Sequence, residues 1–204
     1  MRQINYERRR SRGGKKLIPP NPSQWDNEHW ALDLRDELGV APAMPLDCGE
    51  AFALLPEVGV YPHGEVPAAE VYLDHLRADG ASRWSGMALP LPNGITLVLY
   101  NDSHPRTRIR ATLMEEFFHL WLEHPPSLIR VYQDGEGERI YDPAIEDEAY
   151  ACGAAALVPY QALRSMVHAG KPVEVIAEHF EVSRELVLFR AKVTKLYSQV
   201  VQTA

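Results

Sequence analysis

Cysteine and long apolar runs are scarce in this sequence. Only Cys48 and Cys152 occur among 204 residues, which excludes the disulfide framework of a small secreted domain. No apolar run is long enough to span a membrane, and no apolar signal region is found. We therefore expect a reduced, cytoplasmic protein without membrane contact, long enough for one domain with a sizeable core.

Positive charge is also scarce outside one segment. Residues 1–16 have a net charge of +6, so residues 17–204 carry −13 and the whole chain −7. The basic arm contains Gly13 and Gly14 and is expected to be disordered, and a proline-rich linker follows it to residue 23. The arm could contact nucleic acid or an acidic partner, or it could be a solvated tail. The acidic remainder argues against a simple DNA-binding protein.

Residues 110–124 are the most informative stretch, because they are apolar on nearly every side yet contain Glu115, Glu116 and His119. A helix that is apolar all round is a buried helix. Glu115 and His119 lie about 40° apart on such a helix and point the same way. Buried carboxylates cost free energy unless they are paired, hydrogen-bonded or bound to a metal. The stretch therefore predicts a partner for these groups, unless the glutamates lie on a solvated edge and His119 is a satisfied core histidine.

The spacing of these residues is that of the HExxH helix of zinc peptidases, with Glu115 in place of the first histidine. In HExxH enzymes both histidines bind zinc, and the glutamate activates the metal-bound water as general base. By this pattern Glu115 and His119 are candidate ligands and Glu116 is the candidate base. Such a site needs a third protein ligand.

Glu146 is the candidate third ligand. It lies in the first turn of a helix predicted to end at Pro159, where the helix dipole favours a carboxylate. The small residues behind it would let this helix approach the 110–124 helix closely. Glu148 is an alternative, but it lies about 200° further round the helix, so both cannot face one metal. An ordinary solvated acidic helix start would contain the same residues.

Three blocks of residues, in this order and spacing, resemble the ImmA/IrrE family of metallopeptidases over about residues 31–197. The family patterns are R-x-R-F-T-L-A-H-E-x-x-H, then E-x-E-A-N-x-F-A-x-x-L-L-x-P, then A-x-x-F-x-V-S. The matching residues are Arg108, Arg110, Thr112, Leu113, Glu116 and His119 in the first block, Glu146, Glu148, Ala149, Leu157 and Pro159 in the second, and Ala177, Phe180, Val182 and Ser183 in the third. Because Glu115, Tyr150 and Cys152 depart from these patterns, we expect a divergent branch with an EExxH helix.

The resemblance implies an α+β, zincin-like metallopeptidase fold with a small antiparallel or mixed sheet, a buried metal-site helix and a helical, helix–turn–helix-like C-terminal part. It places the catalytic base at Glu116 and metal ligands at His119 and Glu146, with Glu115 at the position of the first histidine. Zinc is the divalent metal that the resemblance implies. A Glu–His–Glu ligand set is harder and more anionic than His–His–Glu, which moves its preference toward manganese or iron(II) relative to zinc.

Four other residues, besides Glu148, are possible site residues. His124 lies five residues past His119, off the ligand face if the helix continues, although the prolines at 125 and 126 must stop the helix there. It is more typical of a helix-terminal histidine near the last carbonyl groups. Possible donors to a transition state are Tyr141, Tyr150 and His104, and residues of each type are more often structural.

Hydrophobic periodicity predicts further elements around this site. Helices are expected over residues 26–39, 47–55, 161–168, 173–180 and 184–200, a strand over 59–62 and hairpins over 84–100 and 128–141, with 68–78 helical or irregular. The last two helices form a helix–turn–helix-like pair whose apolar residues 186–189 favour packing on the core over reading DNA. We predict a basic arm and linker in 1–23, a metallopeptidase-like domain in 24–160 and a C-terminal helical segment packed on it in 161–204.

Three hypotheses for function follow. The resemblance implies an intracellular metal-dependent endopeptidase that acts on a regulatory protein of the helix–turn–helix repressor type, in a phage, mobile-element or stress circuit. A pseudopeptidase with altered or absent metal would instead act as a regulatory protein-binding module. A DNA-associated regulator would use the C-terminal helices and the basic arm, and its binding would be sensitive to salt.

Overall fold

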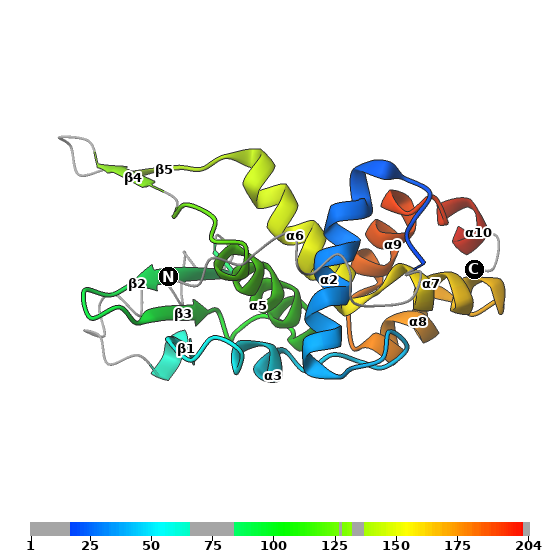
Figure 1. Cartoon of the computed structure of the whole chain (residues 1–204), viewed down its shortest axis with the longest axis horizontal. Helices are drawn as coiled ribbons and strands as arrows, with labels where there is room; N and C mark the ends of the chain where they lie inside the picture. The colour runs from blue at the N-terminus through cyan, green and yellow to red at the C-terminus, as the bar shows by residue number, and fades with distance from the viewer. Residues whose placement is uncertain (1–16, 66–83, 127, 132–136, 202–204) are drawn as a thin grey trace.

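The protein has an α+β fold, as expected, in a computed structural model that describes residues 17–65, 84–126, 128–131 and 137–201 (Figure 1). The predicted arm 1–16 and the segment 68–78 lie outside these residues. One mixed sheet contains β1 (Val58–Pro62), β2 (Gly86–Pro90) and β3 (Thr96–Tyr100) in the order β1-β3-β2. β1 runs parallel to β3 and β2 runs antiparallel to it, which confirms the hairpin expected over 84–100.

Two helices, α5 (Arg106–Trp121) and α6 (Pro143–Leu157), pack against each other at the centre of the molecule (Figure 1). Their contact is close enough to exclude a side chain at Gly153. A Cβ atom there would lie 3.0 Å from the carbonyl carbon of Met114 and 3.1 Å from the backbone nitrogen of Glu115. The small residues of α6 therefore let the two backbones meet, as the sequence predicted. An antiparallel hairpin of β4 (Leu128–Val131) and β5 (Gly137–Ile140) connects the two helices, also as predicted.

Local capping signals define the N-terminal elements. A short turn of 3₁₀ helix, η1 (Pro22–Gln24), leads into α2 (Trp25–Leu38), which ends at Gly39 with a left-handed φ of 67°. The backbone N–H of Gly49 donates to the side chain of Asp47 over 2.7 Å, so Asp47 caps α3 (Cys48–Phe52). Both helices are where the sequence placed them, although α3 is shorter than expected. A second 3₁₀ turn, η2 (His63–Glu65), follows β1.

The C-terminal part is helical, with α7 (Tyr160–His168), α8 (Val173–Phe180), α9 (Arg184–Val193) and α10 (Tyr197–Val201). The side chain of Ser183 accepts the N–H of Leu186 and caps α9, so the expected helix–turn–helix-like pair is formed. The prediction of one helix over 184–200 is wrong. Lys195 has a left-handed φ of 62°, and the N–H of Leu196 donates back to the carbonyl of Ala191 over 2.8 Å, which ends α9.

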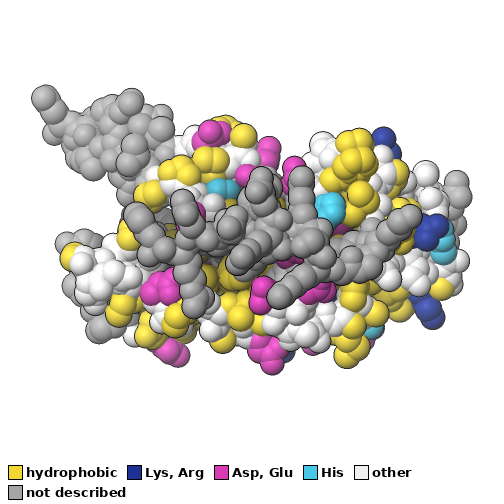
Figure 2. Space-filling view, viewed as in Figure 1, with side chains coloured by type: hydrophobic (Ala, Val, Ile, Leu, Met, Phe, Trp, Pro, Cys, Tyr) yellow, Lys and Arg dark blue, Asp and Glu magenta, His cyan; other side chains and the backbone are white. Residues whose placement is uncertain are grey.

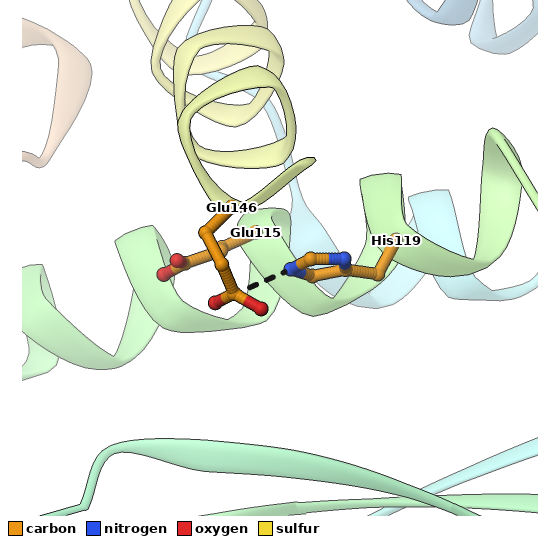
Figure 3. A group of neighbouring side chains, drawn as sticks. All are labelled: Glu115, His119 and Glu146. Atoms are coloured by element: carbon orange, nitrogen blue, oxygen red, sulfur yellow. Dashed lines mark ion pairs between the residues drawn. The ribbon is translucent and has the colours of Figure 1, made fainter. Parts of the chain in front are cut away.

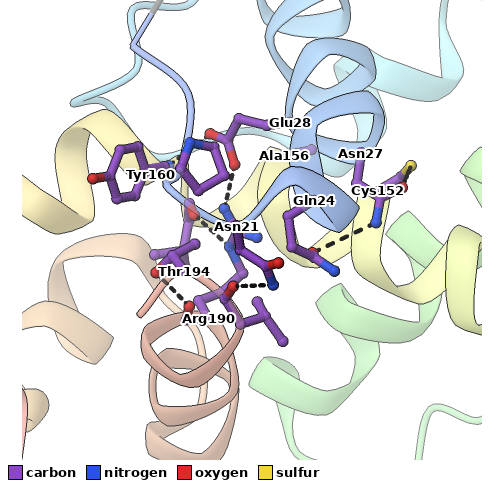
Figure 4. A network of polar contacts seen from close by, with 12 residues as sticks. Asn21, Gln24, Asn27, Glu28, Cys152, Ala156, Tyr160, Arg190 and Thr194 are labelled. Carbon is purple, nitrogen blue, oxygen red and sulfur yellow. Dashed lines mark hydrogen bonds and ion pairs between the residues drawn. The ribbon is translucent and has the colours of Figure 1, made fainter. Parts of the chain in front are cut away.

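A fully buried ion pair joins the two ends of the described chain (Figure 4). The guanidinium of Arg190, on α9, donates to the carboxylate of Glu28, on α2. The other carboxylate oxygen of Glu28 accepts the N–H of Tyr160 over 2.7 Å, and Nε of Arg190 donates to the carbonyl of Val158 over 3.0 Å. This ion pair ties the 161–204 segment to α2 and to the end of α6, while the boundary at residue 160 stays a prediction.

Basic and acidic side chains gather in different places on the surface of the described residues. On the face drawn in Figure 2, the Lys and Arg side chains lie toward the end that carries the C-terminal helices, and Asp and Glu side chains are spread over the middle. Within the described residues, no helix combines the length and the hydrophobicity that crossing a membrane requires.

Candidate metal centre

Three side chains from the two central helices converge on one point. Glu115 and His119 lie one turn apart on α5, and Glu146 reaches them from the first turn of α6 (Figure 3). One ligand atom from each residue lies within 4.8 Å of the others, and Nε2 of His119 is 3.9 Å from a carboxylate oxygen of Glu146. All three residues are partly buried. The structure thus brings together the three residues that the sequence suggested as ligands.

The packing of α5 and α6 explains this convergence. Glu115 follows Met114, whose carbonyl group lies against Gly153, so the helix contact is closest beside the cluster. Asp142 caps the start of α6 by accepting the N–H of Ala144 over 2.9 Å, which fixes where the first turn begins. Glu146 leaves the first turn of α6, and its carboxylate faces the histidine.

The donor set of this cluster fits a divalent cation. Two carboxylates and one imidazole are ligands that zinc, manganese and iron(II) accept. At tetrahedral zinc, with metal–ligand distances of about 2.0–2.2 Å, ligand atoms lie about 3.4 Å apart. The separations in the cluster, 3.9 Å for one pair and at most 4.8 Å for the others, are slightly wider. Small rotations of these partly exposed side chains would bring the ligand atoms to the separation expected at zinc.

Glu116, the candidate base, lies next to the cluster and against the sheet. A Cβ atom at Gly86, the first residue of β2, would lie 3.3 Å from both Cγ and Oε1 of Glu116 and 2.6 Å from Cγ2 of Thr112. The absence of a side chain at Gly86 is therefore what leaves room for Glu116. Gly86 was not predicted as a site residue from the sequence. It lies inside the strand expected at the start of the 84–100 hairpin, and a glycine within a strand is the signal that indicates such a close approach.

His124 and Glu148 lie beside the cluster rather than in it. Nδ1 of His124 is 3.2 Å from Nδ1 of His119, and the two rings meet edge to face. Nε2 of His124 is 3.4 Å from a carboxylate oxygen of Glu148. His124 is therefore not on the face that Glu115 and His119 share, and Glu148 is turned away from that face, as the helix geometry predicted.

The other possible site residues, Tyr150, Tyr141 and His104, lie outside the three-residue cluster. Tyr150 lies one turn beyond Glu146, with its ring against Phe189 of α9. Burial raises the pKa of its hydroxyl, and the negative charge of Glu115 raises this pKa further, so Tyr150 stays protonated at neutral pH. Tyr141 is exposed just before α6, and His104 lies in the turn before α5 with Nε2 3.4 Å from Nδ2 of Asn101. Neither belongs to the three-residue cluster.

Both arginines of the first motif block support the start of α5. Arg110 is buried, and its guanidinium donates to the carbonyl of Leu46 over 2.8 Å and lies 3.5 Å from Glu181. Arg108 donates to Oγ of Ser85 over 2.9 Å, next to Gly86. These contacts anchor α5 to the C-terminal helices on one side and to β2 on the other.

Comparison with known families gives one match. The model of the IrrE N-terminal-like domain, named Peptidase_M78, matches residues 74–192. The matched range is more than half of the chain and includes Gly86, the three cluster residues and Glu116. A comparison with curated proteins finds no match.

Proposed function

Because the chain belongs to the Peptidase_M78 family of IrrE N-terminal-like domains, we propose that it is a metal-dependent endopeptidase whose metal is held by Glu115, His119 and Glu146. The observation that carries this proposal is the convergence of three ligand atoms within 4.8 Å, beside a third glutamate, Glu116. A divalent cation would act as a Lewis acid there, polarising the peptide carbonyl group and lowering the pKa of water. Zinc is the metal expected from the family resemblance, and the two carboxylates favour manganese or iron(II) as alternatives.

Glu116 is the general base in this proposal. It is held beside the cluster by the helix that carries two ligands, and Gly86 leaves its carboxylate unobstructed on the side of β2. From this position it accepts the proton of the attacking water and passes it to the leaving amine. Tyr150, which keeps its proton at neutral pH, is the candidate donor to the developing oxyanion because it lies on the cluster side of α6.

The arrangement of β2 supports a peptide as substrate. In the described part of the sheet, β2 pairs with β3 alone, and its first residue lies against Glu116. An extended peptide that added to this edge would run past the base and the cluster. By resemblance to the ImmA/IrrE proteins, we propose that the substrate is a regulatory protein of the helix–turn–helix repressor type. The two free, buried cysteines support a reducing, cytoplasmic location.

The exchange Glu116→Gln tests this function. The purified chain, loaded with zinc, manganese or iron(II), would be incubated with candidate helix–turn–helix repressors, and cleavage followed by mass spectrometry. We expect the variant to lose about 10²–10⁴-fold in rate, the usual contribution of a general base, while its metal content and unfolding temperature stay those of wild type. Cleavage at the wild-type rate would remove Glu116 from the mechanism.

A pseudopeptidase is the second candidate, and the observation that favours it is Glu115 at the first histidine position. A more anionic ligand set makes the cation a weaker Lewis acid, which lowers hydrolytic power. Under this alternative the chain binds the repressor without cutting it, and Glu116→Gln leaves both binding and the cellular phenotype unchanged. A pull-down of the repressor with both forms, read beside the cleavage assay, separates the two functions.

A further inference from the structure

The end of α5 folds His124 back onto the candidate ligand His119. The N–H of Glu123 donates to the carbonyl of Leu120 over 3.1 Å, and the N–H of His124 donates to the carbonyl of His119 over 2.9 Å. Glu123 adopts a left-handed φ of 54°. These two hydrogen bonds and the left-handed residue form a Schellman motif around the cap residue Leu122. Such a motif brings the second residue after the cap into contact with the third residue before the cap. Here those two residues are His124 and His119, so their contact is a consequence of how the helix ends.

A line of polar contacts runs from the cluster through both histidines to Glu148. Nε2 of His119 faces Glu146, and its Nδ1 lies 3.2 Å from Nδ1 of His124. Nε2 of His124 lies 3.4 Å from Glu148. The His124 side chain is 8 % exposed and that of Glu148 is 43 % exposed, so the line passes through a buried histidine and ends near solvent. We name the pair the His124–Glu148 relay.

We propose that the His124–Glu148 relay consists of two positioning residues that fix the tautomer and the ring orientation of His119. A carboxylate accepts only, so Glu148 places the proton of the His124 ring on Nε2. Nδ1 of His124 then accepts from His119, which keeps the His119 proton on Nδ1 and leaves the Nε2 lone pair directed at the cluster. A histidine that ligates a metal is held by such a partner on its other nitrogen. The relay rests on the proposed function, and it assigns a role to two residues outside the ligand set.

The relay also explains why the N-terminal part of α6 carries two useful acids. Glu146 and Glu148 point to different sides of the helix, and each meets a different histidine. One carboxylate reaches Nε2 of His119 directly. The other reaches Nδ1 of the same ring through His124, so α6 holds the imidazole from both of its nitrogens.

Zinc affinity of the metal-free protein, measured by competition with a chromophoric chelator, is the first test. His124→Phe keeps a ring of similar shape and removes the acceptor, and we expect it to weaken zinc binding about 10–100-fold. Glu148→Ala, at a partly exposed position, should show a smaller loss in the same direction. Two matched controls should bind zinc like wild type: Asp147→Ala removes the neighbouring exposed charge, and Glu123→Gly keeps the left-handed turn.

Nuclear magnetic resonance of protein with ¹⁵N-labelled histidines provides a readout that does not depend on activity. We expect a scalar coupling across the hydrogen bond between Nδ1 of His119 and Nδ1 of His124, in the metal-free and in the zinc-loaded protein, with the proton on His119 once zinc is bound. His124→Phe should abolish it. If wild type shows this coupling but binds no metal, the relay stands and the proposed metallopeptidase function fails. Zinc affinity unchanged in His124→Phe, or no coupling in wild type, would overturn the relay.

Discussion

The protein contains two groups of buried or partly buried charges that are organised in opposite ways. Glu28 and Arg190 are fully buried and carry opposite charges, and their side chains form an ion pair. Each side chain also makes a hydrogen bond with a backbone group. Glu115, His119 and Glu146 are only partly buried, and two of the three carry the same charge. The charges of the first group are paired within the protein, and this pairing holds the C-terminal helices to α2. The second group places like charges together, an arrangement that a bound cation would stabilise, and this contrast supports the proposal that it is the functional group.

Glu28→Gln should have the largest effect on stability. The exchange leaves the guanidinium of Arg190 buried without its counter-charge, and we expect the free energy of unfolding to fall by about 3–5 kcal/mol. Chemical denaturation followed by circular dichroism measures this loss. The exposed residue Glu37, changed to glutamine on the same helix, should stay within about 0.5 kcal/mol of wild type. A comparably small effect of Glu28→Gln would contradict a structural role for the ion pair.

Glu146→Gln should behave in the opposite way. Without metal, the exchange removes one of two like charges, so we expect stability within about 0.5 kcal/mol of wild type, or a slight gain. With zinc at about 100 times its dissociation constant, wild type should gain about 2.7 kcal/mol from binding, and the variant should lose most of this gain. Paired unfolding curves with and without zinc check both statements. A large loss of stability in the metal-free variant would place Glu146 among the structural charges.

Gly86→Ala should lower the rate of catalysis without changing metal binding. The added methyl group would lie 2.6 Å from Cγ2 of Thr112 and 3.3 Å from Oε1 of Glu116, so it should displace the base but not the ligands. A displacement near 1 Å lowers the rate about 10²-fold, and we expect kcat to fall while zinc affinity stays unchanged. Thr112→Ser removes the methyl group that the new side chain would meet. The double variant should therefore recover part of the activity, because only the 3.3 Å contacts with Glu116 remain, and a complete failure of this rescue would argue for a purely structural effect of Gly86.

The smallest expected effect is thiol labelling of the folded protein at Cys48 and Cys152. Burial raises the pKa of the Cys48 thiol to about 11, and burial raises that of Cys152 as well. Both thiols stay protonated up to pH 8, so the folded protein should react with a maleimide far more slowly than the urea-unfolded chain. Mass spectrometry after timed labelling measures the difference. Rapid labelling of the folded protein would show that the interior around the ion pair and α5 opens more readily than its packing indicates.

Features encoded by neighbouring residues were predictable from the sequence. Gly39 ends α2 and Ser183 begins α9 because a helix end is decided by the conformation and side chain of one residue. Glu115 and His119 were placed on one face by helix periodicity alone. Glu146 was proposed from its place in the first turn of a helix, and the family resemblance favoured it over Glu148. Its place opposite Glu115 and His119 depends on how α6 packs against α5.

Features that depend on unusual backbone or on distant residues were not predictable. Lys195 and Glu123 end their helices in a left-handed conformation that residues with a side chain rarely adopt, so the break in 184–200 and the contact of His124 with His119 were both missed. The ion pair of Glu28 and Arg190 joins residues 162 positions apart, and no local pattern indicates it.

The central claim is that the Glu115–His119–Glu146 cluster is a metal site, and the metal content of the protein tests it most directly. The protein would be purified without chelator and analysed by inductively coupled plasma mass spectrometry, before and after incubation with zinc, manganese or iron(II). We predict about one cation per chain in wild type, and a loss of this cation in Glu146→Gln. A metal-free wild-type protein that takes up none of the three metals would contradict the account.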